Sequence, residues 1–275
     1  MGSPCELVCE TRKRSEALEL AMRAAAEAWR IEDKFSRYLP GNIVDQINAA
    51  NGTSVVVDEE TADLLDFSVT LYELSERRFD ITSGVLRRAW HFDGSDRLPE
   101  KLEVEALLRK VGWHRVEWQR PSLQLQAGME IDLGGIGKEY AVDRCTSLLR
   151  EEGSSPCLVN FGGDLAVSGR PRQRSCWKVA VESHAAAAPD RVIELREGAI
   201  ATSGDARRFL AKNGVRYGHI LDPLTGWPVP DAPGSITVAA DSCVQAGMLS
   251  TLGMLKGAEA EAFLKAQDVV FWCRR

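Results

Sequence analysis

The sequence predicts an α+β fold, in which helices and antiparallel strands form separate blocks. Two observations lead to this prediction. Helical patterns dominate roughly the first 111 residues, and from about residue 114 short strand-like runs follow one another. Such segregation is typical of α+β proteins rather than of doubly wound sheets. With 275 residues and no linker-like segment, the chain is predicted to form one domain, 1–275, although two intimately joined halves would also fit.

The predicted helices share apolar residues at helical spacing. They cover 14–34, a short helix after the loop at 36–42, 61–78, and 100–111, which ends at a capping glycine. A last helix is predicted from Cys243 to Lys256, with Asp241 or Ser242 as its N-cap and Gly257 after its end.

The predicted strands share short runs of apolar, β-branched and aromatic residues. They are HRVEWQ (114–119), SLQLQA (122–127), CLVNF (157–161), LAVSG (165–169), WKVAVES (177–183), VIELREG (192–198), AIATSG (199–204) and GSITVAA (234–240). A further strand around Cys5 and Cys9 would place both thiols on one face, where we expect buried small apolar groups.

Composition excludes several functional classes. A formal net charge of −6 does not favour nucleic-acid binding, and no apolar run is long enough to span a membrane. The first residues lack the pattern of a signal peptide, so the chain as given is expected in the cytoplasm, or in the periplasm if a leader was removed. The seven cysteines form no CxxC pair, which argues against a zinc site and a disulfide framework.

The stretch DLGGIGKEYAVDR (132–144) combines a glycine-rich turn with the start of a helix. The preceding QLQAGMEI (124–131) alternates like a strand, so a strand, a turn and a helix are expected in succession. Backbone N–H groups at such a turn, with Lys138 beside them, can bind a phosphate. The alternative is a tight turn with a solvated lysine, because neither common nucleotide fingerprint is present.

Three other polar turns have similar chemistry. They are NFGGDL (160–165), ATSGDARRFL (201–210), in which a helix is expected after the TSGD turn, and GHILDPLTGWPV (218–229), with His219 on a strand. Each also has an ordinary structural explanation as a hairpin, an N-cap or a Pro-Gly turn. Four such turns together favour a phosphate-rich ligand.

From FSRYLPGNIVDQIN through RRFDITSGVLRRAW and these turns to AGMLSTLGMLKG, the chain resembles the FAD:protein FMN transferases of the ApbE family. The resemblance implies a two-lobed, tunnelling-fold-like α+β structure with FAD in a cleft between the lobes. It also implies transfer of FMN from FAD to a Ser or Thr hydroxyl of a target flavoprotein, with release of AMP and with Mg²⁺ at the pyrophosphate. An FAD pyrophosphatase and a catalytically inactive FAD-binding protein are the alternatives.

The resemblance also implies roles for individual residues. Lys138 and His219 are the catalytic candidates, and a histidine with an ordinary pKa near 6.5 can accept a hydroxyl proton at neutral pH. Asp222 could orient the site or only form its turn. Candidate flavin-nucleotide contacts are Tyr38, Asn42, Lys138, Gly163, Asp164, Thr202, Ser203, Gly204, Asp205 and His219. The candidate Mg²⁺ ligands are the Gly137 carbonyl and Thr251.

Three positions depart from the family pattern, and one of them is Asn42, which stands where a serine is usual in the early loop. Where the family has an aspartate that binds Mg²⁺, one turn before Thr251, this chain has Gly247; where the family commonly has glycine, it has Glu139. Since Mg²⁺ normally takes one or two carboxylates, we hypothesise that Glu139 replaces the missing carboxylate. The alternative is that Glu139 lies in solvent and only favours the positive end of its helix.

Overall fold

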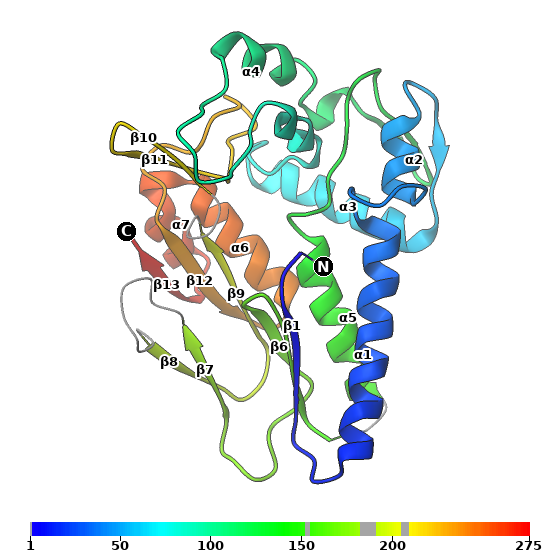
Figure 1. Ribbon diagram of the computed structural model, residues 1–275, viewed down its shortest axis with the longest axis vertical. Coiled ribbons are helices and arrows are strands. Elements are labelled where there is room, and N and C mark those ends of the chain that lie inside the picture. Colours follow the sequence, from blue (N-terminus) through cyan, green and yellow to red (C-terminus); the bar gives the residue numbers. More distant parts are fainter. Residues whose placement is uncertain (1, 152–154, 182–190, 205–208) are drawn as a thin grey trace.

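A six-stranded antiparallel sheet is the largest sheet in the computed structural model, which describes residues 2–151, 155–181, 191–204 and 209–275 (Figure 1). Each strand pairs antiparallel with its neighbours. The strand order is β1 (Cys5–Cys9), β5 (Cys157–Phe161), β6 (Asp164–Val167), β9 (Ala199–Gly204), β12 (Ser235–Ala240) and β13 (Val270–Arg274).

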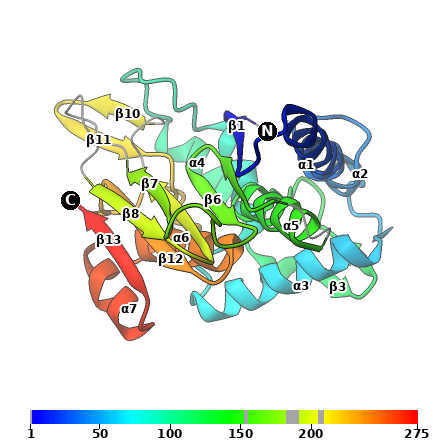
Figure 2. The same ribbon diagram turned by 90° about the horizontal axis from the view of Figure 1, so that it is seen from below.

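Two helices, α5 (Gly137–Glu151) and α6 (Cys243–Leu255), pack on one face of this sheet and against each other. Helix α5 contacts β5 and β6, while α6 contacts β9 and β12. The long helix α1 (Arg14–Phe35) packs on α5, and Figure 2 shows the two side by side. The first turn of α5 and the middle of α6 therefore meet above the sheet.

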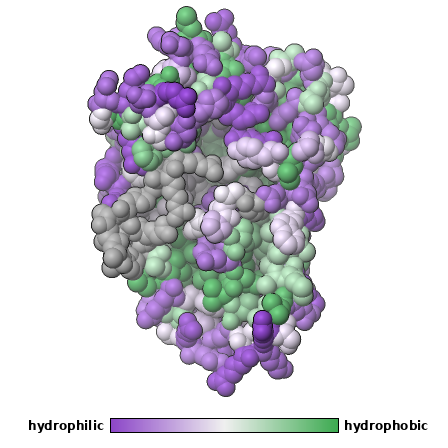
Figure 3. Space-filling view, in the orientation of Figure 1, coloured by the Kyte–Doolittle hydropathy of each residue, from purple (hydrophilic) through white to green (hydrophobic). Residues whose placement is uncertain are grey.

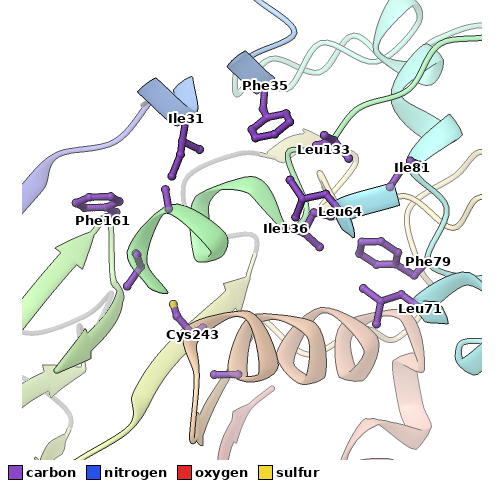
Figure 4. Close-up of a cluster of buried hydrophobic side chains, with 14 of the residues drawn as sticks. Ile31, Phe35, Leu64, Leu71, Phe79, Ile81, Leu133, Ile136, Phe161 and Cys243 are labelled. Atoms are coloured by element: carbon purple, nitrogen blue, oxygen red, sulfur yellow. The ribbon is translucent and has the colours of Figure 1, made fainter. Parts of the chain in front are cut away.

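The largest hydrophobic core lies between these helices and the sheet. In α1 the buried residues recur every three or four positions, which confirms the helix predicted at 14–34; they are Leu20, Ala24, Ala28, Ile31 and Phe35. Figure 4 shows Ile31 and Phe35 with Leu64 of α3 (Glu59–Leu74) and with Leu133 and Ile136, which lead into α5. The core thus fixes where α5 begins.

Smaller elements form a second lobe, at the upper end of the molecule in Figure 1. They are α2 (Ile43–Ala49), α3, the 3₁₀ helices η1 (Ile81–Arg88) and η2 (Trp113–Arg115), α4 (Lys101–Leu108), and a sheet of β2 (Val55–Val56), β4 (Ser122–Gln124) and β3 (Glu117–Gln119). The hairpin of β10 (Phe209–Lys212) and β11 (Val215–Gly218) joins this lobe, because Leu210 packs with Leu86 and Trp90. Its visible surface around α4 is largely hydrophilic (Figure 3).

The opposite face of the large sheet is covered by β7 (Trp177–Val181) and β8 (Arg191–Leu195), which pair with each other. Trp177 and Ile193 pack there with Leu165 of β6. The neighbouring Ala166 belongs to the main core on the helical face. This alternation confirms that both faces of β6 are buried.

Local patterns placed most boundaries within a few residues, and the α+β class is confirmed. Helix α6 begins after Ser242, whose side chain accepts a hydrogen bond from the backbone N–H of Gln245, and it ends just before Gly257, as predicted. Helix α3 likewise begins after Asp58, whose carboxylate accepts the N–H of Thr61.

Several expectations about local structure were wrong. Residues 125–131 are not a strand, because β4 ends at Gln124. Thr202, Ser203 and Gly204 lie on β9 rather than in a turn, and residues 209–212, where a helix was expected, form strand β10. His219 lies just after β11 instead of on it. Cys5 is exposed and Cys9 only half-buried, in place of two buried thiols. Helix α7 (Ala260–Ala266) and β13 were not predicted. No helix among the described residues is long and apolar enough to cross a membrane.

Candidate active site

Lys138 and Asp164 form the centre of the candidate site. Lys138 lies in the first turn of α5 and Asp164 begins β6, and the Lys138 Nζ is 2.5 Å from the Asp164 Oδ2. The other carboxylate oxygen of Asp164, which is buried, accepts the backbone N–H of Thr202 at 2.9 Å. Three of the polar segments singled out in the sequence, 132–144, 160–165 and 201–210, therefore meet at Asp164.

The charge state of Lys138 is set by two opposing effects. Burial alone would lower the pKa of Lys138, but the negative charges of Asp164 and Glu139 outweigh it, and the net shift is upward. Lys138 therefore stays protonated at neutral pH. The alternative of a solvated lysine is wrong for Lys138, whose side chain is about two-thirds covered and paired with Asp164.

The glycine-rich turn itself uses several of its N–H groups internally. Gly134 donates to the Asp132 carboxylate at 2.9 Å, and Ile136 and Gly137 donate to the Leu133 carbonyl at 3.0 and 2.7 Å. These three N–H groups are thus already bonded. The tight-turn reading of the backbone is correct, and the charge that the turn offers to a ligand comes from Lys138.

Hydroxyl groups line the neighbouring helix and strand. The Ser203 Oγ, on β9, lies 2.8 Å from the Ser250 Oγ and 3.0 Å from the Thr251 Oγ1, both on α6. The Thr202 Oγ1 lies 2.9 Å from the Thr237 Oγ1 on β12. The structure therefore brings Ser203 and Thr251 together on the helical face of the sheet, whereas the Thr202 side chain, one residue earlier on β9, lies with Thr237 on the opposite face. Sequence reasoning did not identify Ser250, although it lies beside Thr251 in the AGMLST segment.

Glu139 and Gly247 occupy the same small space between α5 and α6. A Cβ atom added to Gly247 would lie 2.5 Å from the Glu139 Cγ and 3.1 Å from its Oε1, closer than side chains approach one another. Gly247 therefore leaves room for the glutamate side chain. Glu139 is only 8% exposed, so the alternative that it lies in solvent is wrong.

The buried carboxyl group of Glu139 is incompletely hydrogen-bonded and lies close to another negative charge. Its Oε2 is buried and makes no hydrogen bond. Burial, and secondly the charge of Asp164, raise the pKa of Glu139 to about 8, while Lys138 acts in the opposite direction. A bound cation would compensate such a group.

The protein oxygen donors at this position fit a Mg²⁺ ion whose remaining ligands are phosphate oxygens and water. Mg²⁺ commonly uses one or two protein carboxylates, with water and phosphate oxygens completing its shell. Glu139 offers the carboxylate, and Thr251, one helical turn after Gly247, offers a hydroxyl. Within the described ranges, no group of three or more His, Cys, Asp or Glu side chains could hold a metal alone. The binding of Mg²⁺ by Glu139, Thr251 and the Gly137 carbonyl stays a prediction.

The loop before α2 contacts the glycine-rich turn through an arginine that sequence reasoning did not select. Arg37 forms an ion pair with Asp132, and it donates a hydrogen bond to the Tyr38 hydroxyl at 2.7 Å. The Tyr38 ring is 73% exposed beneath the Arg37 guanidinium, so it is available to a ligand and is not a core residue. Asn42 caps α2, because its Oδ1 accepts the Asp45 N–H at 2.9 Å.

His219 lies against aromatic side chains of the second lobe. Its ring is edge-on to Phe92, with centroids 6.3 Å apart, and Phe92 stacks on Trp90. Asp222, buried in the following turn, accepts the N–H of Leu224 at 2.9 Å and a hydrogen bond from Arg78 at 2.9 Å. Asp222 thus shapes the turn after His219. The role of His219 as a base stays a prediction.

The remaining candidates differ in what the structure shows. Gly163 donates its N–H to the Asn160 side chain at 2.9 Å. Gly204 has a packing reason to be glycine, since an added Cβ would lie 2.7 Å from the Gly234 carbonyl oxygen. Asp205 lies outside the described residues. Asp143, not selected earlier, accepts the N–H groups of Cys243 and Val244 at 2.8 and 2.9 Å and so fixes the start of α6 against α5.

Comparison with known proteins relates the chain to one protein family. The profile described as "ApbE family" matches residues 1–271. A Vibrio cholerae protein named FAD:protein FMN transferase is 29% identical over 236 residues, covering 83% of this chain and 71% of the relative. A Chlamydia pneumoniae protein of the same name is 30% identical over 248 residues, covering 87% and 77%.

Solved structures agree over nearly the whole chain. The crystal structure of the ApbE protein from Thermotoga maritima superposes with a TM-score of 0.88 at 30% identity, covering 99% of this chain and 91% of the other. The flavin transferase ApbE from Vibrio cholerae gives a TM-score of 0.87 at 26% identity, covering 99% and 90%.

Proposed function

Because the chain belongs to the ApbE family, we propose that it is an FAD:protein FMN transferase. It takes FAD as substrate and transfers the FMN portion to a Ser or Thr hydroxyl of a target flavoprotein, releasing AMP. Residues 1–275 are proposed to act as one unit, since Arg37, after the first helix, pairs with Asp132 at the start of the glycine-rich turn, and Lys138 at the end of this turn pairs with Asp164.

The observation that carries this proposal is the meeting of Lys138, Asp164 and Glu139 beside the hydroxyls of Ser203 and Thr251. A pyrophosphate carries concentrated negative charge, and cleaving it depends on positioning and charge neutralisation rather than on covalent work by the protein. Lys138 supplies a fixed positive charge, held in place by its ion pair with Asp164.

The reaction balances without an oxidant or reductant. The acceptor hydroxyl oxygen forms a bond to the phosphorus of the FMN portion, and the bond from that phosphorus to the bridging oxygen breaks. AMP leaves with the bridging oxygen, and the hydroxyl proton passes to a base, for which we propose His219. Tyr38, Asn42, Gly163, Thr202, Ser203, Gly204 and Asp205 complete the proposed nucleotide contacts.

Mg²⁺ would be held by the Glu139 carboxylate, the Thr251 hydroxyl and the Gly137 carbonyl. When bound, it supplies charge neutralisation and orientation at the pyrophosphate. We propose that Glu139 provides from α5 the carboxylate that Gly247 of α6 cannot provide. The unpartnered Oε2 of Glu139 and its contact with Gly247 support this assignment.

The test is AMP release from FAD with Mg²⁺, with and without a candidate acceptor flavoprotein, together with covalent flavin fluorescence on the acceptor. We expect acceptor-dependent AMP and a fluorescent acceptor. AMP without an acceptor would instead indicate a pyrophosphatase, and no AMP under either condition would contradict catalysis.

Variants connect that activity to the site. Lys138→Gln should reduce the rate by roughly 100-fold or more, because it removes the charge next to the phosphates. Lys138→Arg keeps the charge and the pairing with Asp164, so it controls for loss of structure. Lys110→Gln, at a lysine whose side chain lies beside Gly128 rather than in the candidate site, is the matched lysine control. Equal activity of Lys138→Gln and Lys110→Gln would contradict the assignment.

A further inference from the structure

Two cysteines face each other across strands β1 and β5. Cys9 and Cys157 are direct partners in the antiparallel register, and their Sγ atoms are 3.2 Å apart. Both are free thiols. Cys157 is completely buried, whereas Cys9, on the edge strand of the sheet, is half-buried.

The register places this pair at a position that suits a covalent link. In an antiparallel ladder, hydrogen-bonded pairs alternate with non-hydrogen-bonded pairs. The Glu10 N–H donates to the Pro156 carbonyl at 2.9 Å, so the neighbouring Cys9–Cys157 pair is of the non-hydrogen-bonded kind. Such pairs have Cα atoms about 4.5 Å apart, within the range of roughly 4.4–6.8 Å found in disulfides.

We propose that Cys9 and Cys157 are a redox modification site that forms a cross-strand disulfide. The oxidant is a small disulfide of the glutathione class. One protein thiolate attacks a sulfur of the small disulfide, forming a mixed disulfide and releasing one small thiol. The second protein thiolate then attacks the protein sulfur of the mixed disulfide, the protein S–S bond forms, and the second small thiol leaves. Two protein thiols are oxidised, and the two protons end on the released thiols.

The surroundings of Cys9 and Cys157 favour a stable structural disulfide over a rapidly exchanging, catalytic one. Burial raises the pKa of Cys9, against the opposing hydrogen bond from Cys157, and burial likewise raises the pKa of Cys157. Thiols with raised pKa values react slowly and are poor leaving groups. The disulfide is therefore expected to form slowly and to resist reduction.

The link would fix the strand that borders the candidate active site. At the other end of β1, the Gly162 N–H donates to the Pro4 carbonyl at 2.9 Å, and Gly162 begins the turn that leads into Asp164. A Cβ added to Gly162 would lie 2.6 Å from the Ser3 Cβ, so the first residues cover this turn closely. A disulfide at Cys9 would hold the register between β1 and β5. It would thereby also keep the residues before β1 packed on the Gly162 turn.

The experiment uses the full chain without flavin. After incubation with oxidised glutathione, the protein is quenched in acid and unfolded, and its thiols are counted against a dithiothreitol-treated sample. We expect loss of two of the seven thiols, a Cys9–Cys157 cross-linked peptide by mass spectrometry, and a Tm rise of about 5 °C or more.

Two variants make the result specific. Cys9→Ala should keep its Tm unchanged by oxidation and should form no cross-linked peptide. Cys5→Ser, on the same strand, is the matched control and should respond like the wild type. Retention of all seven thiols in the wild type, or the same Tm rise in Cys9→Ala, would overturn the proposal.

Discussion

Replacing Gly247 by alanine should reveal whether Glu139 occupies the space of the missing side chain. In an ordinary helix interior this substitution stabilises a protein by roughly 1 kcal/mol, because glycine is the weaker helix former. Here the new Cβ would lie 2.5 Å from the Glu139 Cγ. Overpacking of a closely packed interior typically costs about 1–3 kcal/mol. We therefore expect Gly247→Ala to destabilise the protein by on the order of 1 kcal/mol.

The effect of Gly247→Ala on the free energy of unfolding should change sign when the Glu139 side chain is truncated. In a Glu139→Ala background the contact is absent, so Gly247→Ala should be neutral or should stabilise by up to ~1 kcal/mol. The two substitutions should thus couple by about 1–3 kcal/mol in a double-mutant cycle. Gly137→Ala is the control, since its Cβ would meet no heavy atom within 4 Å and its effect should be the same in both backgrounds.

The assay is urea unfolding of the wild type, the two single variants and the double variant, together with Gly137→Ala in both backgrounds. A chelator in the buffer ensures that no metal contributes to stability. The free energies of unfolding are compared at constant denaturant slope. Additive effects of Gly247→Ala and Glu139→Ala would refute the packing argument. A stabilised Gly247→Ala single variant would refute it as well.

Further predictions concern the metal, the proton balance, the proposed base and the ligand. Glu139→Gly should weaken Mg²⁺ binding by roughly 10-fold or more in the presence of FAD, and Glu139→Gly with Gly247→Asp should restore it; calorimetric titration with unchanged affinity in the single variant would contradict the role. Since the folded-state pKa of Glu139 is raised to about 8, the metal-free folded protein keeps a proton that the unfolded chain loses. Stability should therefore fall as the pH rises from about 5 to 8, and a Glu139→Gln variant showing the same fall in urea unfolding would refute this. His219→Ala should slow FMN transfer by roughly 100-fold at nearly unchanged FAD affinity, and a wild-type rate would assign the histidine to structure. FAD should bind more tightly than FMN, because the four polar turns exceed what a mononucleotide requires; equal affinities in equilibrium titration would count against it.

Local sequence patterns were sufficient where neighbours along the chain decide the structure. The buried spacing in α1 and the Ser242 cap of α6 both act within a few residues, so periodicity and capping chemistry located these helices. The same local signals failed at residues 125–131 and at β10. There the pairing and burial provided by distant segments decide the conformation, as when Leu210 enters the core with Leu86 and Trp90.

The sequence by itself determined which residue types are present for the chemistry: a lysine after a glycine-rich turn, an aspartate at a strand end, hydroxyls, and a glutamate and a glycine at two unusual positions. Only the tertiary structure decided that Glu139 is buried against Gly247 and that Lys138 is paired with Asp164. The physical reason is that α5 and α6 pack on one sheet face and are held by Asp143 at the start of α6. Packing between helices far apart in the chain leaves no local pattern in the sequence.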